Sequence, residues 1–191
     1  MRALRFATIS LLLAVSACMP FGQVGQQAST HADDKLALKR SAFEELPDEI
    51  ALRALARSIS AVGGRGEPVR LSKLESLLTA MRDGPSKTHT LAGCRIVPSR
   101  GEIGVFREVR GRGLPSLELA PGVRALWDNR FRVELLPRDG SEITVRALGD
   151  EGWRACKERA PELSALPRYA AAALPAGWCR DRIVLLPSFL P

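Results

Sequence analysis

Apolar residues recur at every third or fourth position in two stretches of the chain, and this spacing predicts two amphipathic helices. The first is expected to start at Pro47, which suits a first turn, and to stop at Gly63 and Gly64. The second should start where Ser72 and Glu75 can form a capping box. The apolar faces consist of Leu52, Leu55, Ile59 and Val62 in the first helix and Leu74, Leu77, Leu78 and Met81 in the second. We expect the two helices to pack as an antiparallel pair that ends at residues 83–85.

Beyond residue 85 the hydrophobic pattern changes to a period of two, which predicts strands. Residues 88–97 and 102–109 flank a turn-forming segment and indicate a hairpin. The side chains expected to meet across it are Cys94, Ile96, Ile103 and Val105. Another strand is expected at residues 126–133, with a turn at 137–140 and a partner strand at 142–148.

The stretch 126–133 carries both aromatic and basic residues. If it is extended, Trp127, Phe131 and Val133 lie on one face, and Arg130 and Arg132 share the other. The sequence Asp-Asn at 128–129 suits a turn or a bulge. The pattern is compatible with a core strand that has a solvated basic edge and also with a basic binding surface.

The last part of the chain predicts a short helix containing Trp153 and Cys156, followed by an Ala-rich segment. Prolines forbid one continuous helix there, at Pro161, Pro167 and Pro175. Trp178 and the apolar run 183–186 favour a final buried strand. The fold class is therefore expected to be α+β, with an N-terminal helical pair followed by a small, mainly antiparallel β-sheet domain with short helices. The expected division is 1–35, 36–85 and 86–191.

The first 18 residues resemble a secretion signal. Arg2 and Arg5 precede an apolar run at 6–15, and residues 15–18 resemble a bacterial lipoprotein cleavage box that would place a lipid on Cys18. The apolar run is shorter than the roughly 20 residues of a comfortable membrane span. The alternative is a truncated amphipathic or buried helix, and residues 19–34 favour a flexible linker. Both locations therefore stay open: a cytoplasmic protein, or a periplasmic lipoprotein associated with the membrane through Cys18.

The charge balance is basic. The chain has 191 residues, 28 Lys and Arg against 21 Asp and Glu, and a net charge of +7, which favours an acidic partner such as nucleic acid or anionic lipid. The four cysteines are scattered without the short spacings of a zinc site or redox motif, so no metal is expected and the thiols are interpreted as mostly small buried residues. They are Cys18, Cys94, Cys156 and Cys179.

No catalytic motif is present in the sequence. There is no nucleophile elbow, Walker-type loop or Cys-His pair of usable spacing, and the two histidines are His31 and His89. The carboxylates at 44–45 and 48–49 are explained by their position at helix starts. Residues 110–115 form a basic, glycine-containing loop, but they lack the strand and helix context of a phosphate loop. We expect no catalytic residue and no bound cofactor.

An ordered set of short motifs resembles tRNA(Ile)-lysidine synthetase over roughly residues 36–190. The motifs are residues 46–55 (LPDEIALRAL), 61–64, 67–70, 90–95 (TLAGCR), 107–108, 126–131 (LWDNRF), 147–149, 152–153 and Trp178 before Arg182 and Ile183. The similarity is to the C-terminal portion of proteobacterial members of that family.

The resemblance implies an ATP-dependent ligase that adenylates an anticodon cytidine of an isoleucine tRNA and joins lysine to it. ATP and Mg would serve the full-length family enzyme. The family's N-terminal ATP-pyrophosphatase domain, with its Ser-Gly-Gly-x-Asp-Ser loop, has no counterpart here, so the chain is expected to be non-catalytic by itself, with a possible separately encoded catalytic domain as partner. On this resemblance, 36–85 is a helical substrate-binding subdomain and 86–191 a tRNA-binding domain.

The resemblance turns nine arginines into candidate tRNA contacts, because guanidinium groups match phosphate oxygens and stack on bases. They are Arg53, Arg57, Arg65, Arg70, Arg107, Arg112, Arg124, Arg130 and Arg132. For each of them a merely solvated surface position is the alternative. The competing functional hypothesis is a secreted lipoprotein with a non-enzymatic envelope interaction domain.

Overall fold

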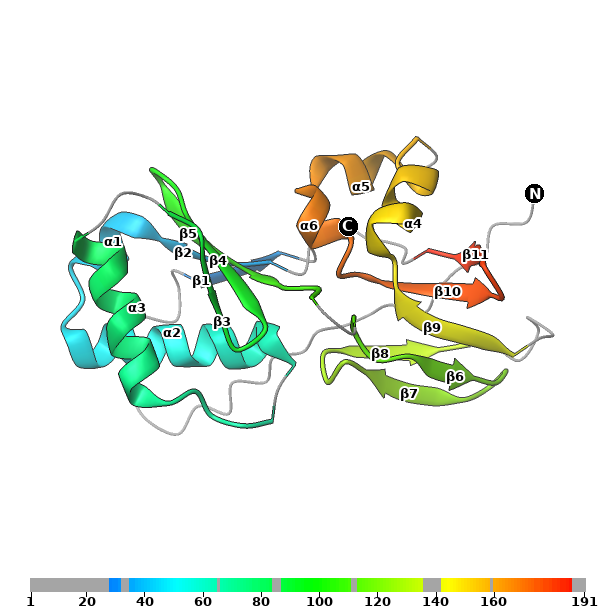
Figure 1. Cartoon of the computed structure of the whole chain (residues 1–191), viewed down its shortest axis with the longest axis horizontal. Coiled ribbons are helices and arrows are strands. Elements are labelled where there is room, and N and C mark those ends of the chain that lie inside the picture. Colours follow the sequence, from blue (N-terminus) through cyan, green and yellow to red (C-terminus); the bar gives the residue numbers. More distant parts are fainter. Residues whose placement is uncertain are drawn as a thin grey trace. The chain divides into compact units, whose positions relative to one another are not determined.

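The computed structural model describes residues 28–31, 35–64, 66–83, 87–110, 113–135, 142–158 and 160–186. These residues form two units, one ending at Glu108 and the other beginning at Val109 (Figure 1). The sequence suggested a division between residues 85 and 86, so the strands at 89–107 group with the helices rather than with the later strands. The signal-like segment, Cys18, Arg65, Arg112 and the expected turn at 137–140 lie outside the described residues.

The N-terminal unit contains a five-stranded antiparallel sheet with the order β1-β2-β5-β4-β3. The strands are β1 (Ala28–His31), β2 (Lys35–Lys39), β3 (His89–Leu91), β4 (Cys94–Pro98) and β5 (Glu102–Arg107). The expected β4–β5 hairpin is confirmed, with Ile96 opposite Val105 and Pro98 opposite Ile103. β1 falls within the stretch interpreted as a linker, and it pairs with β2. The sheet thus combines strands that come before and after the helices in the chain.

Three helices join the two parts of this sheet: α1 (Arg40–Glu44), α2 (Asp48–Gly63) and α3 (Leu71–Asp83). α2 begins after Pro47 and is capped by Gly64 at φ 63°, as the sequence predicted. α3 begins two residues earlier than a cap at Ser72 would place it. The amides of Lys73 and Leu74 donate to the carbonyl of Arg70, so Ser72 lies inside the first turn and does not cap the helix.

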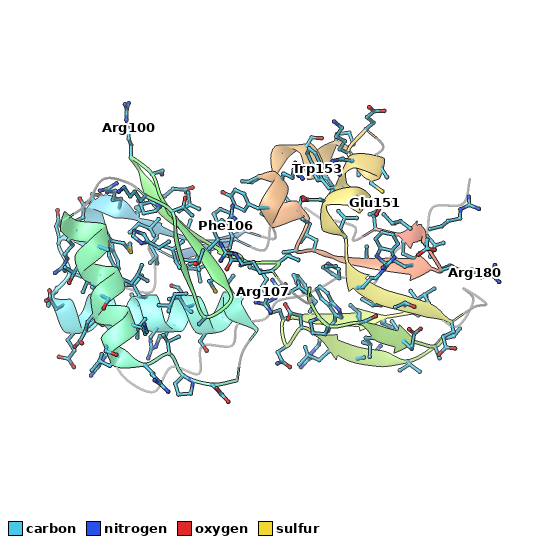
Figure 2. All side chains as sticks on the ribbon, viewed as in Figure 1. Arg100, Phe106, Arg107, Glu151, Trp153 and Arg180 are labelled. Atoms are coloured by element: carbon cyan, nitrogen blue, oxygen red, sulfur yellow. The ribbon has the colours of Figure 1, made fainter. Side chains whose placement is uncertain are left out.

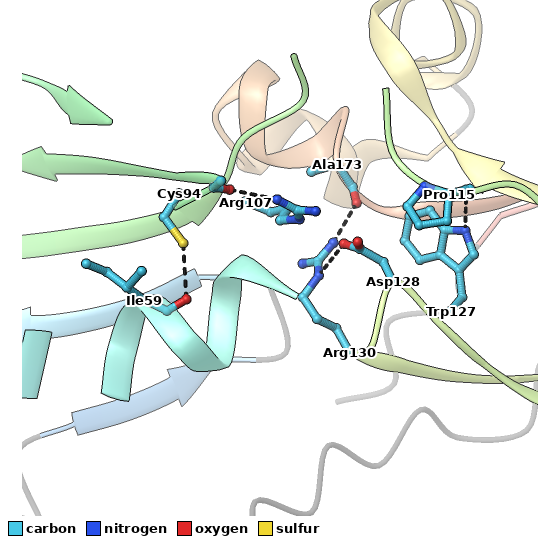
Figure 3. A network of polar contacts seen from close by, with 9 residues as sticks. Ile59, Cys94, Arg107, Pro115, Trp127, Asp128, Arg130 and Ala173 are labelled. Carbon is cyan, nitrogen blue, oxygen red and sulfur yellow. Dashed lines mark hydrogen bonds and ion pairs between the residues drawn. The ribbon is translucent and has the colours of Figure 1, made fainter. Parts of the chain in front are cut away.

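One hydrophobic core holds the helices on the sheet. The predicted helix faces are confirmed, since Leu55, Ile59, Leu74 and Leu78 are buried against strand residues that include Cys94, Ile96, Ile103 and Val105. The Cys94 thiol donates to the carbonyl of Ile59 at 3.3 Å (Figure 3). A Cβ at Gly63 would lie 2.8 Å from the Ala92 carbonyl oxygen. Glycine therefore permits the end of α2 to approach the turn between β3 and β4. The helical pair is therefore half of a helix-on-sheet unit.

The C-terminal unit contains a four-stranded antiparallel sheet, β11-β10-β9-β6, and a separate two-stranded sheet, β7-β8. The strands are β6 (Leu117–Leu119), β7 (Arg124–Trp127), β8 (Phe131–Glu134), β9 (Ile143–Ala147), β10 (Pro175–Cys179) and β11 (Arg182–Leu185). The expected partnership of residues 142–148 with the central strand is wrong, because β9 pairs with β6 and β10. The predicted single strand at 126–133 is instead a hairpin.

Helices cover one face of the larger sheet: α4 (Gly149–Cys156), α5 (Pro161–Ala165) and α6 (Arg168–Ala171). Their core includes Leu148, Leu163, Leu174 and Trp178. A second core joins the β7-β8 hairpin to the sheet through Trp127, Val133, Ile143, Val145 and Leu185. Pro161 and Pro167 stand at helix starts, so the predicted interruptions are confirmed. The final buried strand is β10, whereas in β11 Val184 is exposed.

The α+β class predicted from the sequence is confirmed, with helices α2 and α3 and antiparallel sheets. The order within the class differs from the prediction, since strands precede the helical pair and a sheet packs directly on it. No helix in the described part of the chain is long and apolar enough to cross a membrane.

Candidate nucleic-acid interface

Four of the nine candidate arginines lie in the described part of the N-terminal unit. Arg53 and Arg57 are exposed on α2, one turn apart, and Arg53 pairs with Glu49. Arg70 is exposed just before α3, and neither it nor Arg57 has an ion pair with a described residue. Arg107 is half-buried at the end of β5, where Nη1 donates to the Gly93 carbonyl at 2.9 Å (Figure 3). Arg57 and Arg70 are therefore the better placed of these four for an external anion.

The β7-β8 hairpin positions two further candidates on its outer face. Arg124 lies opposite Glu134 and pairs with it at 2.9 Å, while Arg132 lies opposite Leu126. Leu126 is 56% exposed between them. The inner face carries Trp127, Phe131 and Val133, as the alternation predicted. This face of the hairpin thus presents arginines beside an exposed apolar side chain.

Arg130 does not share that outer face. Asp128 and Asn129 have φ of 49° and 56°, and the Arg130 amide donates to the Trp127 carbonyl at 3.1 Å, the pattern of a type I′ turn. The Arg130 guanidinium is buried, with Nε 2.8 Å from the Asp128 carboxylate and Nη2 3.2 Å from the Ala173 carbonyl (Figure 3). Its role in the structure is to fasten the hairpin turn to the segment after α6.

Two aromatic side chains, Trp127 and Phe131, flank this turn. Trp127 is 1% exposed, and its Nε1 donates to the Pro115 carbonyl at 2.8 Å (Figure 3). The Arg130 guanidinium also lies 4.7 Å from the centre of the Phe131 ring. The turn sequence Trp-Asp-Asn-Arg-Phe, which contributed to the family resemblance, is therefore explained by packing and by a buried ion pair.

Two arginines outside the candidate set contact tryptophan rings. The Arg146 guanidinium lies 4.0 Å from the centre of the Trp178 ring, and the Arg168 guanidinium lies 5.9 Å from the centre of the Trp153 ring. Lys157 lies 5.2 Å from the same Trp153 ring. Sequence reasoning missed these pairs because their members come from different elements. The sequence signal that could have pointed to one of them is the spacing of Thr144 and Arg146, which places both side chains on the same face of a predicted strand.

Arg168 is committed to a second partner. Its Nε and Nη2 atoms lie 2.8 and 2.6 Å from the two carboxylate oxygens of Asp150. The hydrogen bond and the charge of Arg168 lower the pKa of Asp150, and Asp150 in turn raises the pKa of Arg168. Since Asp150 lies in the first turn of α4 and Arg168 begins α6, this forked pair fixes one helix to the other.

Acidic residues in the described segments show no arrangement that suggests metal chemistry. Asp48 and Glu49 at the start of α2 pair with Arg82 and Arg53, whereas Glu44 lies at the end of α1, not at a helix start as expected, and pairs with Arg40. Among the described residues no group of three His, Cys, Asp or Glu side chains could hold a metal ion. Cys94 and Cys156 are buried and Cys179 is exposed, so most of the described thiols are buried, as predicted.

Comparison with known proteins identifies tRNA(Ile)-lysidine synthases of several bacteria as relatives. The chain is 35% identical over 134 residues to the tRNA(Ile)-lysidine synthase of Caulobacter vibrioides, covering 68% of this chain and 32% of the relative. It is 30% identical over 151 residues to that of Ruegeria pomeroyi, covering 78% and 33%. It is 31% identical over 114 residues to that of Wolbachia pipientis wMel, covering 59% and 26%.

No family model matches the chain, and no solved structure matches it. The chain spans about a quarter to a third of the length of these curated relatives. At about 30% identity over 114 to 151 residues, this chain is a distant homologue of part of the tRNA(Ile)-lysidine synthases.

Proposed function

We propose that this chain is the C-terminal, tRNA-binding part of a tRNA(Ile)-lysidine synthetase system. The observation that carries the proposal is the partial similarity to tRNA(Ile)-lysidine synthases, which extends over 78% of this chain in the Ruegeria pomeroyi relative. The region contributes no catalytic residue. Lysine ligation, with its ATP and Mg, belongs to a catalytic domain in the same polypeptide or in a separately encoded partner.

Charge and exposure support RNA as the partner. The whole chain has a net charge of +7, and phosphate neutralisation by Lys and Arg dominates nucleic-acid affinity. The candidate contacts that are exposed in the structure are Arg53, Arg57, Arg70, Arg124 and Arg132. An arginine paired with a surface carboxylate, such as Arg53 or Arg124, can exchange that partner for a phosphate because exposed ion pairs are weak.

Equilibrium binding to an isoleucine tRNA transcript tests the proposal. Fluorescence anisotropy of the labelled tRNA should show saturable binding of one protein per tRNA. Unlabelled tRNA should displace the labelled tRNA at a lower concentration than heparin does, when both competitors are compared per negative charge. Failure to saturate, or displacement by heparin as readily as by RNA, would show that the chain does not recognise tRNA.

A second candidate function rests on the sequence of residues 1–18. A bacterial lipoprotein anchored through Cys18 would reside in the periplasm, with a non-enzymatic envelope interaction domain, and a tRNA enzyme has no substrate there. We favour the cytoplasm, because the similarity to tRNA(Ile)-lysidine synthases covers much more of the chain than this segment. Mass spectrometry of the expressed protein decides between them: an unlipidated N-terminus excludes anchoring, and a lipid on Cys18 contradicts the tRNA role.

A further inference from the structure

Three arginines gather where β10 turns into β11. Arg180 and Asp181 form the turn, and Arg182 begins β11 opposite Cys179, which places it on the face of the sheet opposite Trp178 and Arg146. Arg146 comes from the neighbouring strand β9, and its Nη2 lies 4.0 Å from the Asp181 carboxylate. Arg180 and Arg182 are exposed and have no ion pair or side-chain hydrogen bond with a described residue. Figure 2 shows Arg180 at the tip of this hairpin.

Stacking holds the Arg146 guanidinium in a defined orientation. It lies 4.0 Å from the centre of the Trp178 ring, and its side chain is 42% exposed. The ion pair with Asp181 contributes little to this orientation, because the Asp181 side chain is fully exposed and the separation is long. A guanidinium that stacks through its face keeps the N–H groups along its edge for an anion.

Trp178 is an unusual choice for a purely apolar role. It is 7% exposed, and its Nε1 is buried without an acceptor among the described residues, whereas buried indole N–H groups ordinarily find one. Phenylalanine would fill apolar space here without burying a donor. Tryptophan is, however, the best aromatic partner for a guanidinium. We infer that the ring is retained as a platform for Arg146.

Two carboxylates lie close to these side chains. Asp181 faces Arg146, and Glu118 accepts hydrogen bonds from the Thr144 hydroxyl at 2.9 and 3.0 Å. Thr144 lies opposite both Trp178 and Glu118 in the sheet. Glu118 keeps its negative charge, because its donor is the neutral Thr144 hydroxyl, so binding of an anion here would depend on the oriented Arg146 guanidinium and not on an excess of positive charge.

We propose that Arg146, held on Trp178, forms with Arg180 a subsite for backbone phosphates of RNA. The proposal rests on the tRNA-binding function above and assigns it a location in the C-terminal unit. It adds Arg146 as the oriented contact and Trp178 as its positioning residue.

The first test compares Arg146→Ala with Arg168→Ala in tRNA binding by the whole chain. Both variants remove one exposed arginine near a tryptophan ring of the same unit, but Arg168 is committed to Asp150. Loss of Arg146 should weaken tRNA affinity about tenfold and make the salt dependence shallower by about 0.7 to 0.9 in log–log slope. The Arg168 variant should bind within about twofold of wild type. Equal losses in both variants would overturn the subsite.

Trp178→Phe separates a platform from a packing role. If Trp178 only packs, the variant should bind tRNA like wild type, and its thermal stability is unchanged or higher because a buried unpaired donor is removed. If Trp178 orients Arg146, affinity for tRNA falls about threefold while stability is maintained, since phenylalanine is a weaker partner for a cation. Wild-type affinity in this variant would overturn the positioning role.

Arg146→Lys keeps the test valid if the alanine variant does not fold. It retains the positive charge but loses the planar guanidinium group, so affinity for tRNA should fall several-fold. Failure of this proposal and failure of the proposed function are distinguishable. A wild-type chain that does not bind tRNA refutes the function itself, while normal binding by both Arg146 variants refutes only the subsite.

Discussion

The two units contain the same number of basic residues and use them differently. Thirteen Lys and Arg lie in residues 28–108 and thirteen in 109–191, but twelve of the latter are Arg, and all three tryptophans also lie there. In the N-terminal unit, Arg40 and Arg53 pair with glutamates one helical turn away. In the C-terminal unit, cations lie over aromatic rings at Arg130, Arg146, Lys157 and Arg168. Net charge alone therefore does not distinguish the units, whereas the partners of the guanidinium groups do.

Their cores differ in a corresponding way. The N-terminal unit has one continuous apolar core between helices and sheet, in which the side chains of Leu55 and Ile59 are almost completely buried. The C-terminal unit divides its apolar residues between two smaller cores and adds the buried Arg130–Asp128 pair. We therefore expect truncation of a buried apolar side chain to reduce stability most in the N-terminal unit. In the C-terminal unit, loss of the buried Arg130–Asp128 ion pair should reduce stability most.

The largest effect is expected from Arg130→Met. The side chains of Arg130 and Asp128 are 4% and 3% exposed, so the variant leaves a carboxylate buried without its cation. The free energy of unfolding of the C-terminal unit should fall by about 3–5 kcal/mol. Tryptophan fluorescence during urea denaturation measures this, since all three tryptophans report on that unit. The matched variant Arg132→Met, on the exposed face of β8, should stay within about 0.5 kcal/mol of wild type, and equal losses would refute the fastening role.

Leu55→Ala tests the other side of the comparison. Leu55 is completely buried in α2, and its truncation should reduce the free energy of unfolding by about 2–5 kcal/mol through lost burial and a cavity. Far-ultraviolet circular dichroism during denaturation follows the helices of this unit. Leu71→Ala is the control, because Leu71 is 59% exposed on α3. A small effect at Leu55 would contradict the single-core description.

A smaller effect is expected from Gly93→Ala. Gly93 has φ 78°, and an added Cβ would collide with the Arg107 guanidinium, so we expect a loss of about 1–3 kcal/mol in unfolding free energy. Gly113→Ala is the control for backbone strain alone, because Gly113 has φ 80° and its Cβ would meet no described atom. Its loss should be nearer about 1 kcal/mol. If thermal denaturation shows the same loss of stability in both variants, the Arg107 side chain moves away from the added Cβ without an energetic cost, which would contradict the prediction.

The smallest effect concerns pH. Because Arg168 lowers the pKa of Asp150 in the folded chain, their pair stabilises the fold above the ordinary carboxyl pKa of about 4. This contribution is lost as the pH falls through the lower folded value. Urea midpoints of wild type and Arg168→Ala should therefore differ at pH 6 and converge as the pH falls below the lowered pKa of Asp150. A difference that persists at the lowest pH would show that Arg168 acts by packing on Trp153 instead.

The sequence was sufficient for elements with a long, regular pattern. The apolar spacing of Leu55, Ile59 and Val62 gave α2 correctly, and the turn between Pro98 and Glu102 gave the β4–β5 hairpin. The β3–β4 hairpin was missed because its two-residue turn places Ala92 at φ 50°, a conformation that alanine rarely adopts and its sequence does not signal. Regular local patterns are thus predictable, whereas a turn imposed by neighbouring strands is not.

The candidate site was predictable only in part. Arg132 lies on an exposed face as the alternation implied, but Arg130 does not, since the turn at Asp128 and Asn129 breaks the period of two and directs its side chain inward. The contact between Arg146 and Trp178 depends on the pairing of β9 with β10. Partners from strands so distant in the chain cannot be identified from a pattern within either strand.

The most direct test of the central claim is the salt dependence of tRNA binding by the whole chain. If arginines of this chain neutralise tRNA phosphates, the logarithm of the affinity for isoleucine tRNA should fall linearly with the logarithm of salt concentration. Three or more contacts give a slope of about −2 or steeper. Binding that is absent at low salt, or that is indifferent to salt, would contradict the account.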